Sequence, residues 1–340
     1  MRICVISQMA MELMGQIPTA WVLPDLVMGI DGGQTALKCA LATRDGILLG
    51  QGQGSGLLHL AQDGGPERFQ QALDEALRAA WAEAGLEPRP VAALVMGLTG
   101  VTSAGTPEAA LAVRLAGGLI KAAKIAAESD ALAALKGAHA GGPGIISIAG
   151  TGSITLGIDQ RGRLERAGGW GWLLGDEGSA FWIGREGLRA ALRAQEGLGP
   201  NTALLPAFQT HFQVEELIQI KRVVFSAGFG AQGFAALAPL VSAAAENGDT
   251  AGGDILRQAG QELAASVRAV ANRLDFGLEP VAVAPVGGAF EHFPGLRRSF
   301  EAHLGAAGRF AVAPPLYPPV IGAVLMARQL ADQINPQETS

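Results

Sequence analysis

Residues 167–179 combine residue types that could bind a sugar. The segment reads A-G-G-W-G-W-L-L-G-D-E-G-S, with dense glycine, two tryptophans and an acidic pair. Glycine lets the backbone approach a ligand, tryptophan rings offer flat apolar faces, and the carboxylates of Asp176 and Glu177 can accept hydrogen bonds from hydroxyl groups. A tight turn into a helix over residues 179–194, with the acids only favouring the helix N-terminus, explains the segment about equally well.

Two glycine loops between strand-like runs could hold phosphate groups. Residues 26–35 read L-V-M-G-I-D-G-G-Q-T, and residues 145–153 read I-I-S-I-A-G-T-G-S. An acid that ends a buried strand can hold a hydrated Mg²⁺, while the backbone N–H groups that follow it hold phosphate oxygens. Neither loop has the Gly-Lys-Ser/Thr pattern of a P-loop. Together they predict duplicated lobes that face each other across a nucleotide, with a chance pair of hairpin turns as the alternative.

Asp130 is a candidate catalytic base. In the run E-S-D-A-L-A-A-L it lies where a short strand is expected to end and a helix to begin. A carboxylate within about 2.6–3.2 Å of a sugar hydroxyl can orient that group and accept its proton. From position alone, an N-cap that accepts hydrogen bonds from helix N–H groups is the stronger interpretation.

These residues need strands and helices to position them, and the sequence pattern predicts an α/β fold. We expect a strand-rich stretch to about residue 54, then alternating helices and strands over residues 67–128. A long helical region across residues 185–279 precedes a strand at residues 281–286, and the last helix is expected at residues 319–332. Such alternation favours a layered α/β architecture, and the hairpin-like first strands predict a mixed sheet.

The composition favours a cytoplasmic enzyme that acts on small molecules. The chain has 340 residues, of which 49% are hydrophobic, so it can build cores for two domains. Cys4 and Cys39 suggest neither a disulfide framework nor a metal-binding pattern. The net charge of −6 and the lack of a Lys/Arg-rich tract argue against a nucleic-acid partner. No apolar run in the sequence approaches the roughly 20 residues that cross a membrane.

From about residue 26 to about residue 330, the chain resembles the N-acetylglucosamine kinase group of the actin-like ATPase superfamily. That group also includes the activator ATPases of benzoyl-CoA reductase and 2-hydroxyacyl-CoA dehydratase. The most specific element is G-G-W-G-W-L-L-G-D-E-G-S, and I-D-G-G-Q-T, E-S-D-A-L-A-A-L, I-A-G-T-G-S and V-A-P-V-G-G-A-F support it. The resemblance implies two ribonuclease H-like lobes, each with a mixed five-stranded sheet flanked by helices, and a nucleotide in the cleft between the lobes.

Domain boundaries follow from the resemblance. Residues 1–25 are expected to form an N-terminal extension without a counterpart in the family, and we assign it no function. Residues 26–140 match the first lobe, and residues 141–318 match the larger second lobe. Residues 319–340 are expected to carry a C-terminal helix that packs back on the first lobe.

The resemblance also assigns roles to individual residues. Asp130 is the implied catalytic base and a sugar contact, and Asp31 would hold Mg²⁺ through a water molecule. The implied ligands of the ATP phosphates are Gly32, Gly33, Thr35, Lys38, Gly150, Thr151, Gly152 and Ser153, although the family often has its basic residue closer to the threonine than Lys38 is. Adenosine binding is implied for Gly287 and Gly288, and sugar binding for Trp170, Gly171, Asp176 and Glu177.

One departure from the family pattern concerns the sugar. Relatives commonly have an asparagine that contacts the sugar in the loop matching residues 54–60, where this chain reads G-S-G-L-L-H-L. Leucine cannot replace the hydrogen bonds of an amide, so the identity of the sugar stays open. His59 could substitute from the next position, although a surface histidine is the stronger interpretation. The run G-L-T-G-V-T at residues 97–102 could form another wall of the sugar site or only a strand-ending turn.

Three functions are consistent with these patterns. The leading one is an ATP-dependent kinase that transfers the γ-phosphate to a hydroxyl, expected at O6, of an amino sugar such as N-acetylglucosamine or glucosamine. The second is an activator ATPase, but such proteins hold an iron-sulfur cluster between subunits through paired cysteines, which this chain lacks. The third is a nucleotide-sensing module, which would have no need of a catalytic base. A homodimer is an expectation from analogy with other sugar kinases.

Overall fold

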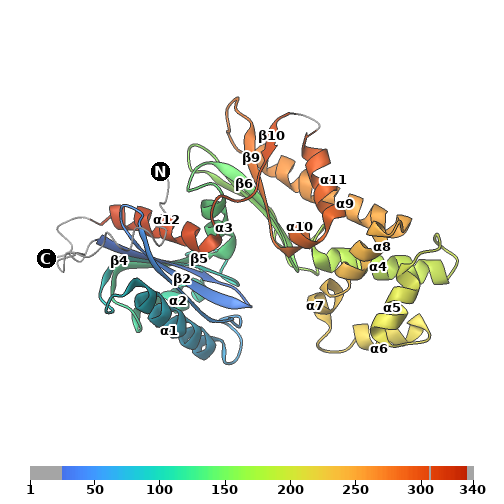
Figure 1. The fold of residues 1–340 in the computed structure, drawn as a ribbon, viewed down its shortest axis with the longest axis horizontal. Helices are drawn as coiled ribbons and strands as arrows, with labels where there is room; N and C mark the ends of the chain where they lie inside the picture. Colours follow the sequence, from blue (N-terminus) through green and yellow to red (C-terminus); the bar gives the residue numbers. More distant parts are fainter. Residues whose placement is uncertain (1–24, 306–307, 335–340) are drawn as a thin grey trace. The chain divides into compact units, whose positions relative to one another are not determined.

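The computed structural model describes residues 25–305 and 308–334, so residues 1–24 of the expected extension lie outside the described residues. The chain divides into two units (Figure 1). Unit 1 runs to Gly142 and resumes at Pro315, and unit 2 comprises Pro143–Pro314. Each unit is built on its own five-stranded sheet.

The sheet of unit 1 has the strand order β3-β2-β1-β4-β5. Its strands are β1 (Leu26–Gly32), β2 (Ala36–Thr43), β3 (Leu48–Ser55), β4 (Val91–Leu98) and β5 (Ala122–Ser129). The first three strands form an antiparallel meander, whereas β4 lies parallel to β1 and β5 lies parallel to β4. The mixed sheet predicted from the sequence is therefore confirmed. Because β1, β4 and β5 run in one direction, the residues at their carboxyl ends meet at one edge of the sheet.

Helices cover both faces of this sheet. α1 (Gly65–Ala84) and α2 (Pro107–Gly117) pack on one face, where they bury Met28 and Ile30 of β1. α12 (Pro319–Asp332) packs on the other face, against Val27, and lies beside α3 (Asp130–Ala138) (Figure 1). Successive strand side chains point to opposite faces, so the apolar run of β1 serves both helix layers.

Glycine allows the close packing of α12 on the sheet. A Cβ atom at Gly29 of β1 would overlap the Val324 nitrogen and would lie 2.7 Å from the Val320 carbonyl oxygen of α12. A Cβ atom at Gly322 of α12 would in turn overlap the Ala133 carbonyl oxygen of α3. Any side chain at these positions would push the helices apart, so the sequence needs glycine there.

Unit 2 repeats the strand pattern of unit 1. Its sheet has the order β10-β9-β6-β7-β8, with β6 (Gly144–Ala149), β7 (Ser153–Ile158), β8 (Leu164–Gly168), β9 (Val281–Val286) and β10 (Phe310–Val312). β6, β7 and β8 form an antiparallel meander, β9 is parallel to β6, and β10 is parallel to β9. This repetition of order and direction is the duplicated architecture that the two glycine loops predict.

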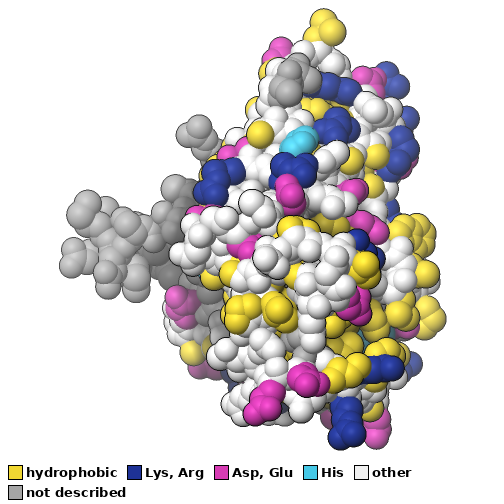
Figure 2. Space-filling model, turned by 90° about the vertical axis from the view of Figure 1, so that its right-hand side faces the viewer, with side chains coloured by type: hydrophobic (Ala, Val, Ile, Leu, Met, Phe, Trp, Pro, Cys, Tyr) yellow, Lys and Arg dark blue, Asp and Glu magenta, His cyan; other side chains and the backbone are white. Residues whose placement is uncertain are grey.

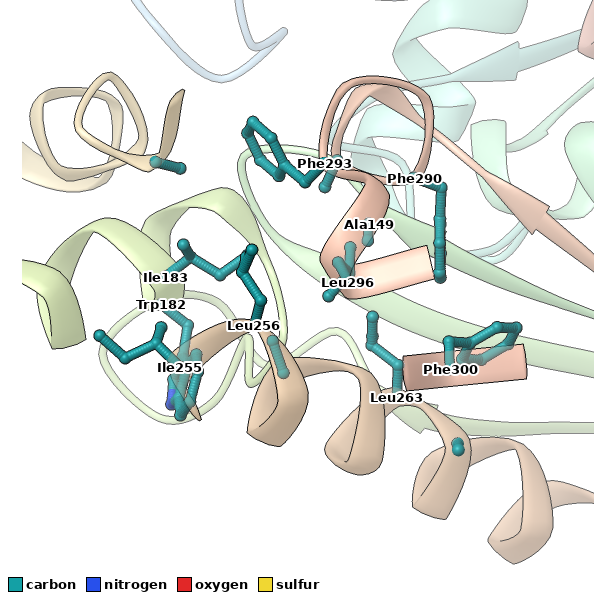
Figure 3. Packing of buried hydrophobic residues seen from close by; sticks show 14 of the residues in the cluster. Ala149, Trp182, Ile183, Ile255, Leu256, Leu263, Phe290, Phe293, Leu296 and Phe300 are labelled. Atoms are coloured by element: carbon teal, nitrogen blue, oxygen red, sulfur yellow. The ribbon is translucent and has the colours of Figure 1, made fainter. Parts of the chain in front are cut away.

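Helices make up about half of unit 2. α4 (Ala180–Gln195), α5 (Leu204–Phe212), α6 (Ile220–Val224), α7 (Gly230–Ala235), α8 (Ala238–Glu246) and α9 (Thr250–Ala271) precede β9, and α10 (Gly288–His292) and α11 (Pro294–Gly305) follow it. Buried side chains of α4, α9 and α11, among them Ile183, Leu256 and Phe300, form the core (Figure 3). None of the helices in the described ranges is long and apolar enough to cross a membrane.

Candidate active site

Asp31 lies near the carboxyl end of β1, where the chain turns into β2. It is paired with Lys38 in the antiparallel register and with Gly97 of β4 in the parallel register. The turn is closed by the Gly33 N–H, which donates to the Ala36 carbonyl oxygen at 3.0 Å. The sequence thus places a half-buried carboxylate beside a turn in which Gln34 and Thr35 are exposed.

The surroundings of Asp31 disfavour its charged form. The pKa of Asp31 is raised to about 6. Burial is the largest cause, the charge of Asp130 also raises the pKa, and the neighbouring Lys38 ammonium partly opposes this rise. A carboxylate that is both partly buried and close to a second carboxylate gains from a nearby cation. The structure therefore brings Asp130 close to Asp31 and Lys38, which lie far earlier in the sequence.

Asp130 is the first residue of α3, directly after β5. Its neighbour Ser129 caps the helix, because the Ser129 hydroxyl accepts a hydrogen bond from the Leu132 N–H at 3.2 Å. The Asp130 carboxylate accepts the N–H of Ala131 at 2.7 Å. Burial raises the pKa of Asp130, while hydrogen bonds from the Ala131 N–H and the Thr99 hydroxyl lower it. Ser129 therefore fills the N-cap position, while the Asp130 carboxylate accepts a helix N–H group in the first turn.

Glu128 is a second acidic residue at the end of β5 that sequence reasoning did not single out. Its pKa is raised by burial and lowered by a hydrogen bond from the Ala104 N–H. Glu128 lies two positions before Asp130 in the run E-S-D, so the sequence shows a second carboxylate beside the candidate base. Its partial burial depends on the loop that contains Ala104, and no local pattern indicates that contact.

The loop at residues 150–153, which we call the phosphate loop, joins β6 to β7. The Gly150 N–H donates to the Gly152 carbonyl oxygen at 2.9 Å, and the first turn of α4 donates from Ala180 to the Gly150 oxygen at 2.9 Å. Among the described residues, no acceptor receives the N–H of Thr151 or Gly152. The loop therefore has a fixed shape and two backbone donors available for an anion.

A cavity of about 720 Å³ in unit 2 brings the phosphate loop and the proposed adenosine motif together. It is lined by Gly150 and Thr151 of the loop and by Gly288 at the start of α10. The adjoining Gly287 has φ +102°, and a Cβ atom there would lie 2.6 Å from the Ala149 carbonyl oxygen. Glycine is needed at this turn because both the conformation and the space exclude a side chain.

The same cavity includes polar side chains that sequence reasoning missed. They come from three helices: Gln232 of α7, Ser242 and Glu246 of α8, and His292 of α10. The Thr151 hydroxyl donates to the Gln232 side-chain oxygen at 3.4 Å, which links one of them to the phosphate loop. These residues lie far apart in the sequence and form no local motif, because only the packing of the three helices brings them to one cavity.

The predicted sugar-binding segment, residues 169–178, follows β8, and we call it the acceptor loop. Trp170 is 63% exposed, and the Arg166 guanidinium lies over its ring at 4.6 Å from the centroid. Glu177 is exposed, and Gly171 has φ +80° in an open position. Hydrophobic side chains are visible at several places on the face of the molecule drawn in Figure 2. The exposure of Trp170 argues against a core role and leaves its ring accessible to a ligand.

Asp176 differs from the other predicted sugar ligands because it is only 7% exposed. Burial raises its pKa, a hydrogen bond from the Ser153 N–H lowers it, and the charge of Glu177 raises it. The carboxylate thus lies beside the phosphate loop.

The loop at residues 54–60, which lacks the asparagine expected from relatives, lies in unit 1. Leu57 is buried and Leu58 is exposed. His59 is exposed, and its ring packs over Gly100, where a Cβ atom would lie 2.6 Å from the imidazole Cδ2. This contact brings the loop next to the run at residues 97–102, as expected if both segments line one site.

Cys39 does not have the environment of an iron-sulfur ligand. It lies in β2, is 1% exposed, and has a pKa raised to about 12 by burial. A metal-binding cysteine acts as an accessible thiolate, so this thiol suits the core better than a cluster. Cys4 lies outside the described residues.

Comparison with known proteins gives consistent results. The chain matches the BadF/BadG/BcrA/BcrD ATPase family over residues 28–327. It is 28% identical over 308 residues to the N-acetylmuramic acid/N-acetylglucosamine kinase of Clostridium acetobutylicum, covering 90% of this chain and 99% of the relative. It is 27% identical over 239 residues to a glucosamine kinase of Vibrio cholerae, covering 69% and 77% of the two chains.

A solved structure supports the same relationship. The structure of a protein from Chromobacterium violaceum, assigned by name as an N-acetylglucosamine kinase, superposes with a TM-score of 0.69 at 29% identity. The match covers 90% of this chain and 99% of that protein. The similarity therefore extends over both units of the fold.

Proposed function

The chain belongs to the BadF/BadG/BcrA/BcrD ATPase family, and we propose that it is an ATP-dependent kinase of an amino sugar such as N-acetylglucosamine or glucosamine. The observation that carries most weight is the pair Asp31 and Asp130, which interact electrostatically at the carboxyl ends of β1 and β5. The relatives named as amino-sugar kinases cover most of the chain and support this class of acceptor.

In the proposed reaction, Asp130 is the general base. Its carboxylate accepts the proton of the sugar 6-hydroxyl while the hydroxyl oxygen bonds to the γ-phosphorus of ATP. The bond between that phosphorus and the β,γ-bridging oxygen breaks, and ADP leaves with the electron pair. The raised pKa of Asp130 makes its carboxylate a better proton acceptor than an ordinary exposed aspartate. Hydrogen bonds from Ala131 and Thr99 fix its orientation.

Asp31 is the proposed ligand of Mg²⁺, through a water molecule. Oxygen donors such as carboxylates and water suit this ion, and the burial that raises the Asp31 pKa marks a position where a cation is favoured. Bound Mg²⁺ would neutralise phosphate charge as the γ-phosphoryl group transfers. Gly32, Gly33 and Thr35 in the same turn, and Lys38 beside it, are the proposed phosphate contacts of unit 1.

Unit 2 supplies the proposed nucleotide pocket. The free N–H groups of Thr151 and Gly152 would donate to phosphate oxygens. Gly150 and Ser153 were also expected as phosphate ligands, but their N–H groups donate to the Gly152 carbonyl oxygen and the Asp176 carboxylate. The cavity of about 720 Å³ can hold a nucleoside, and Gly287 and Gly288 let the backbone approach it closely.

The acceptor loop is the proposed sugar-binding segment, with contacts from Trp170, Gly171, Asp176 and Glu177. The exposed Trp170 ring would cover an apolar sugar face, and the Glu177 carboxylate would accept hydroxyl hydrogen bonds. The names of the Clostridium and Vibrio relatives differ in whether the sugar is acetylated. The missing asparagine at residues 54–60 leaves the choice between these sugars to experiment.

Release of ADP from Mg-ATP tests the proposal directly. The acceptors would be glucosamine, N-acetylglucosamine, N-acetylmannosamine, glucose and a control without sugar. Strong stimulation by an amino sugar, with the phosphorylated sugar identified by mass spectrometry, is the expected result. Turnover that no sugar stimulates would overturn the kinase assignment.

We also propose that the protein works in the cytoplasm, because its phosphoryl donor is ATP. Its proposed partners are the sugar and the nucleotide, and a homodimer is an extension by analogy. Light scattering of the purified chain would measure the oligomeric state directly.

A further inference from the structure

Hydrogen bonds around Ser153 join the acceptor loop of unit 2 to its phosphate loop. The Ser153 N–H donates to Asp176 Oδ1 at 3.1 Å, and the Ser153 hydroxyl donates to the Glu177 carbonyl oxygen at 2.9 Å. The Gly169 N–H donates to the Ser153 carbonyl oxygen at 3.1 Å. One residue of the phosphate loop is therefore bonded to both ends of the acceptor loop.

Asp176 is held in an unusual conformation to make this connection. Its backbone has φ +67°, in the left-handed region that residues other than glycine rarely adopt. Its carbonyl oxygen accepts the N–H of Ser179, the N-cap of α4, at 3.1 Å. A backbone in this region costs free energy, and it persists only where the surrounding contacts require it.

Both oxygens of the Asp176 carboxylate are used against the phosphate loop. Oδ1 accepts the Ser153 N–H, and Oδ2 covers Gly152, where a Cβ atom would lie 2.7 Å away. With the Ser153 N–H committed to Asp176, Thr151 and Gly152 are the loop residues whose N–H groups stay available for phosphate. The side chain thus occupies one backbone donor of the phosphate loop and leaves two others available.

We infer that Asp176 is a positioning residue whose buried carboxylate couples the acceptor loop to the phosphate loop, so that sugar binding and ATP binding strengthen each other. This inference rests on the proposed function, and it gives Asp176 a role beyond a direct sugar contact. A ligand that orders the acceptor loop would also order the bonded phosphate loop, so the second ligand loses less conformational entropy. Such coupling is reciprocal in the two binding affinities.

The two roles of Asp176 predict different losses. If the residue only contacts sugar, its removal raises the KM for sugar and leaves ATP affinity without sugar unchanged. If it positions the phosphate loop, its removal weakens ATP binding even without sugar. A measurement of ATP affinity in the absence of sugar therefore separates the roles.

The experiment uses the full chain and a fluorescent ATP analogue, with and without N-acetylglucosamine. Asp176→Gly removes the carboxylate and tolerates the positive φ, so the backbone is not strained by the change. We expect it to raise the Kd for the analogue at least roughly fivefold without sugar, because the Ser153 N–H loses its acceptor. We also expect the effect of sugar on that Kd, present in the wild type, to disappear.

Two further variants keep the test decisive. Asp176→Asn retains an acceptor oxygen for the Ser153 N–H and should restore most of the ATP affinity. Gly152→Ala places a methyl group against Asp176 Oδ2 and should weaken ATP binding from the other side of the contact. Asp254→Asn, at an exposed position of α9, makes the same chemical change as a control and should leave the Kd unchanged. Circular dichroism and melting temperature show whether each variant is folded.

The outcomes distinguish this inference from the kinase proposal. Unchanged ATP affinity in both folded Asp176→Gly and Gly152→Ala would overturn the inference, as would a wild type in which sugar does not alter the Kd of the analogue. If both of those variants failed to fold, Ser153→Ala, which removes the hydroxyl bond to the Glu177 carbonyl oxygen, would replace them. Weaker coupling between sugar and the ATP analogue in this variant would support the inference, and unchanged coupling would overturn it. Absence of sugar-stimulated ADP release in the wild type would instead refute the proposed function.

Discussion

Replacement of Asp31 by asparagine should stabilise the ligand-free protein while impairing its proposed metal site. The pKa of Asp31 rises from its ordinary value of 3.8 to about 6 in the folded chain, mainly through burial. Each tenfold change in proton affinity corresponds to about 1.4 kcal/mol. Ionised Asp31 therefore destabilises the ligand-free fold by about 3 kcal/mol at pH 8. Asparagine has no charge to bury, so Asp31→Asn should recover most of this free energy.

The pH dependence of the stabilisation follows from the direction of the pKa change. Above pH 6 the carboxyl of Asp31 is ionised in both the folded and the unfolded chain, so the wild type carries the whole cost. As the pH falls through 6, the folded form takes up a proton first, and the cost falls to about 1.5 kcal/mol at pH 5. Near the ordinary value of 3.8 the cost approaches zero. The advantage of Asp31→Asn should therefore be largest at pH 8 and roughly half as large at pH 5.

Thermal unfolding without nucleotide or metal measures this difference. A gain of about 3 kcal/mol corresponds to a rise of about 6–12 °C in the melting temperature of a unit of this size. Asp63→Asn, which changes an exposed carboxylate in the same unit, is the matched control and should melt within about 1 °C of the wild type. A melting temperature of Asp31→Asn at or below the wild-type value at pH 8 would refute the reasoning. So would a difference that stays constant between pH 8 and pH 5.

Three other substitutions test the catalytic base, the sugar contact and the packing of the last helix. Asp130→Asn should lower turnover by at least about 100-fold with nearly normal ATP binding, because the amide cannot take the hydroxyl proton; turnover that stays within a few-fold of wild type would remove Asp130 from the mechanism. Trp170→Ala should weaken sugar binding more than ATP binding in calorimetry, whereas equal losses would indicate a structural role. Gly29→Ala should destabilise the protein by at least about 2 kcal/mol in chemical denaturation, since its Cβ would overlap the backbone of α12. Gly105→Ala, in open space, should have little effect, and equal stability of these two variants would contradict the packing argument.

Much of the fold could be predicted because its signals are local. The apolar runs of β1 and β6, each followed by a glycine turn and a second strand, repeat along the chain and predict duplicated mixed sheets. The last helix was expected at residues 319–332, and α12 spans Pro319–Asp332. Family motifs placed candidate residues on both units. Such features depend on residues that are neighbours in the sequence, so a short segment is enough to recognise each of them.

The roles of several side chains could not be predicted from any short segment of the sequence. Asp130 was ambiguous from its position, and only the hydrogen bond between the Ser129 hydroxyl and the Leu132 N–H shows which residue caps α3. Asp176 was expected to bind sugar hydroxyls or to favour the N-terminus of the following helix, yet the structure buries it against Gly152 and Ser153. Burial is a property of the whole fold, so local composition cannot specify it.

The sequence by itself determined the strand and helix order, the glycine turns and the chemical types available to the site. The tertiary structure decided which of them act together. It brings Asp31 and Asp130 to one sheet edge because β1, β4 and β5 are parallel. It also gathers Gln232, Glu246 and His292 around one cavity. The physical reason is that pKa changes and cavities arise from charges and surfaces close in space, and long-range packing brings together residues that lie far apart in the chain.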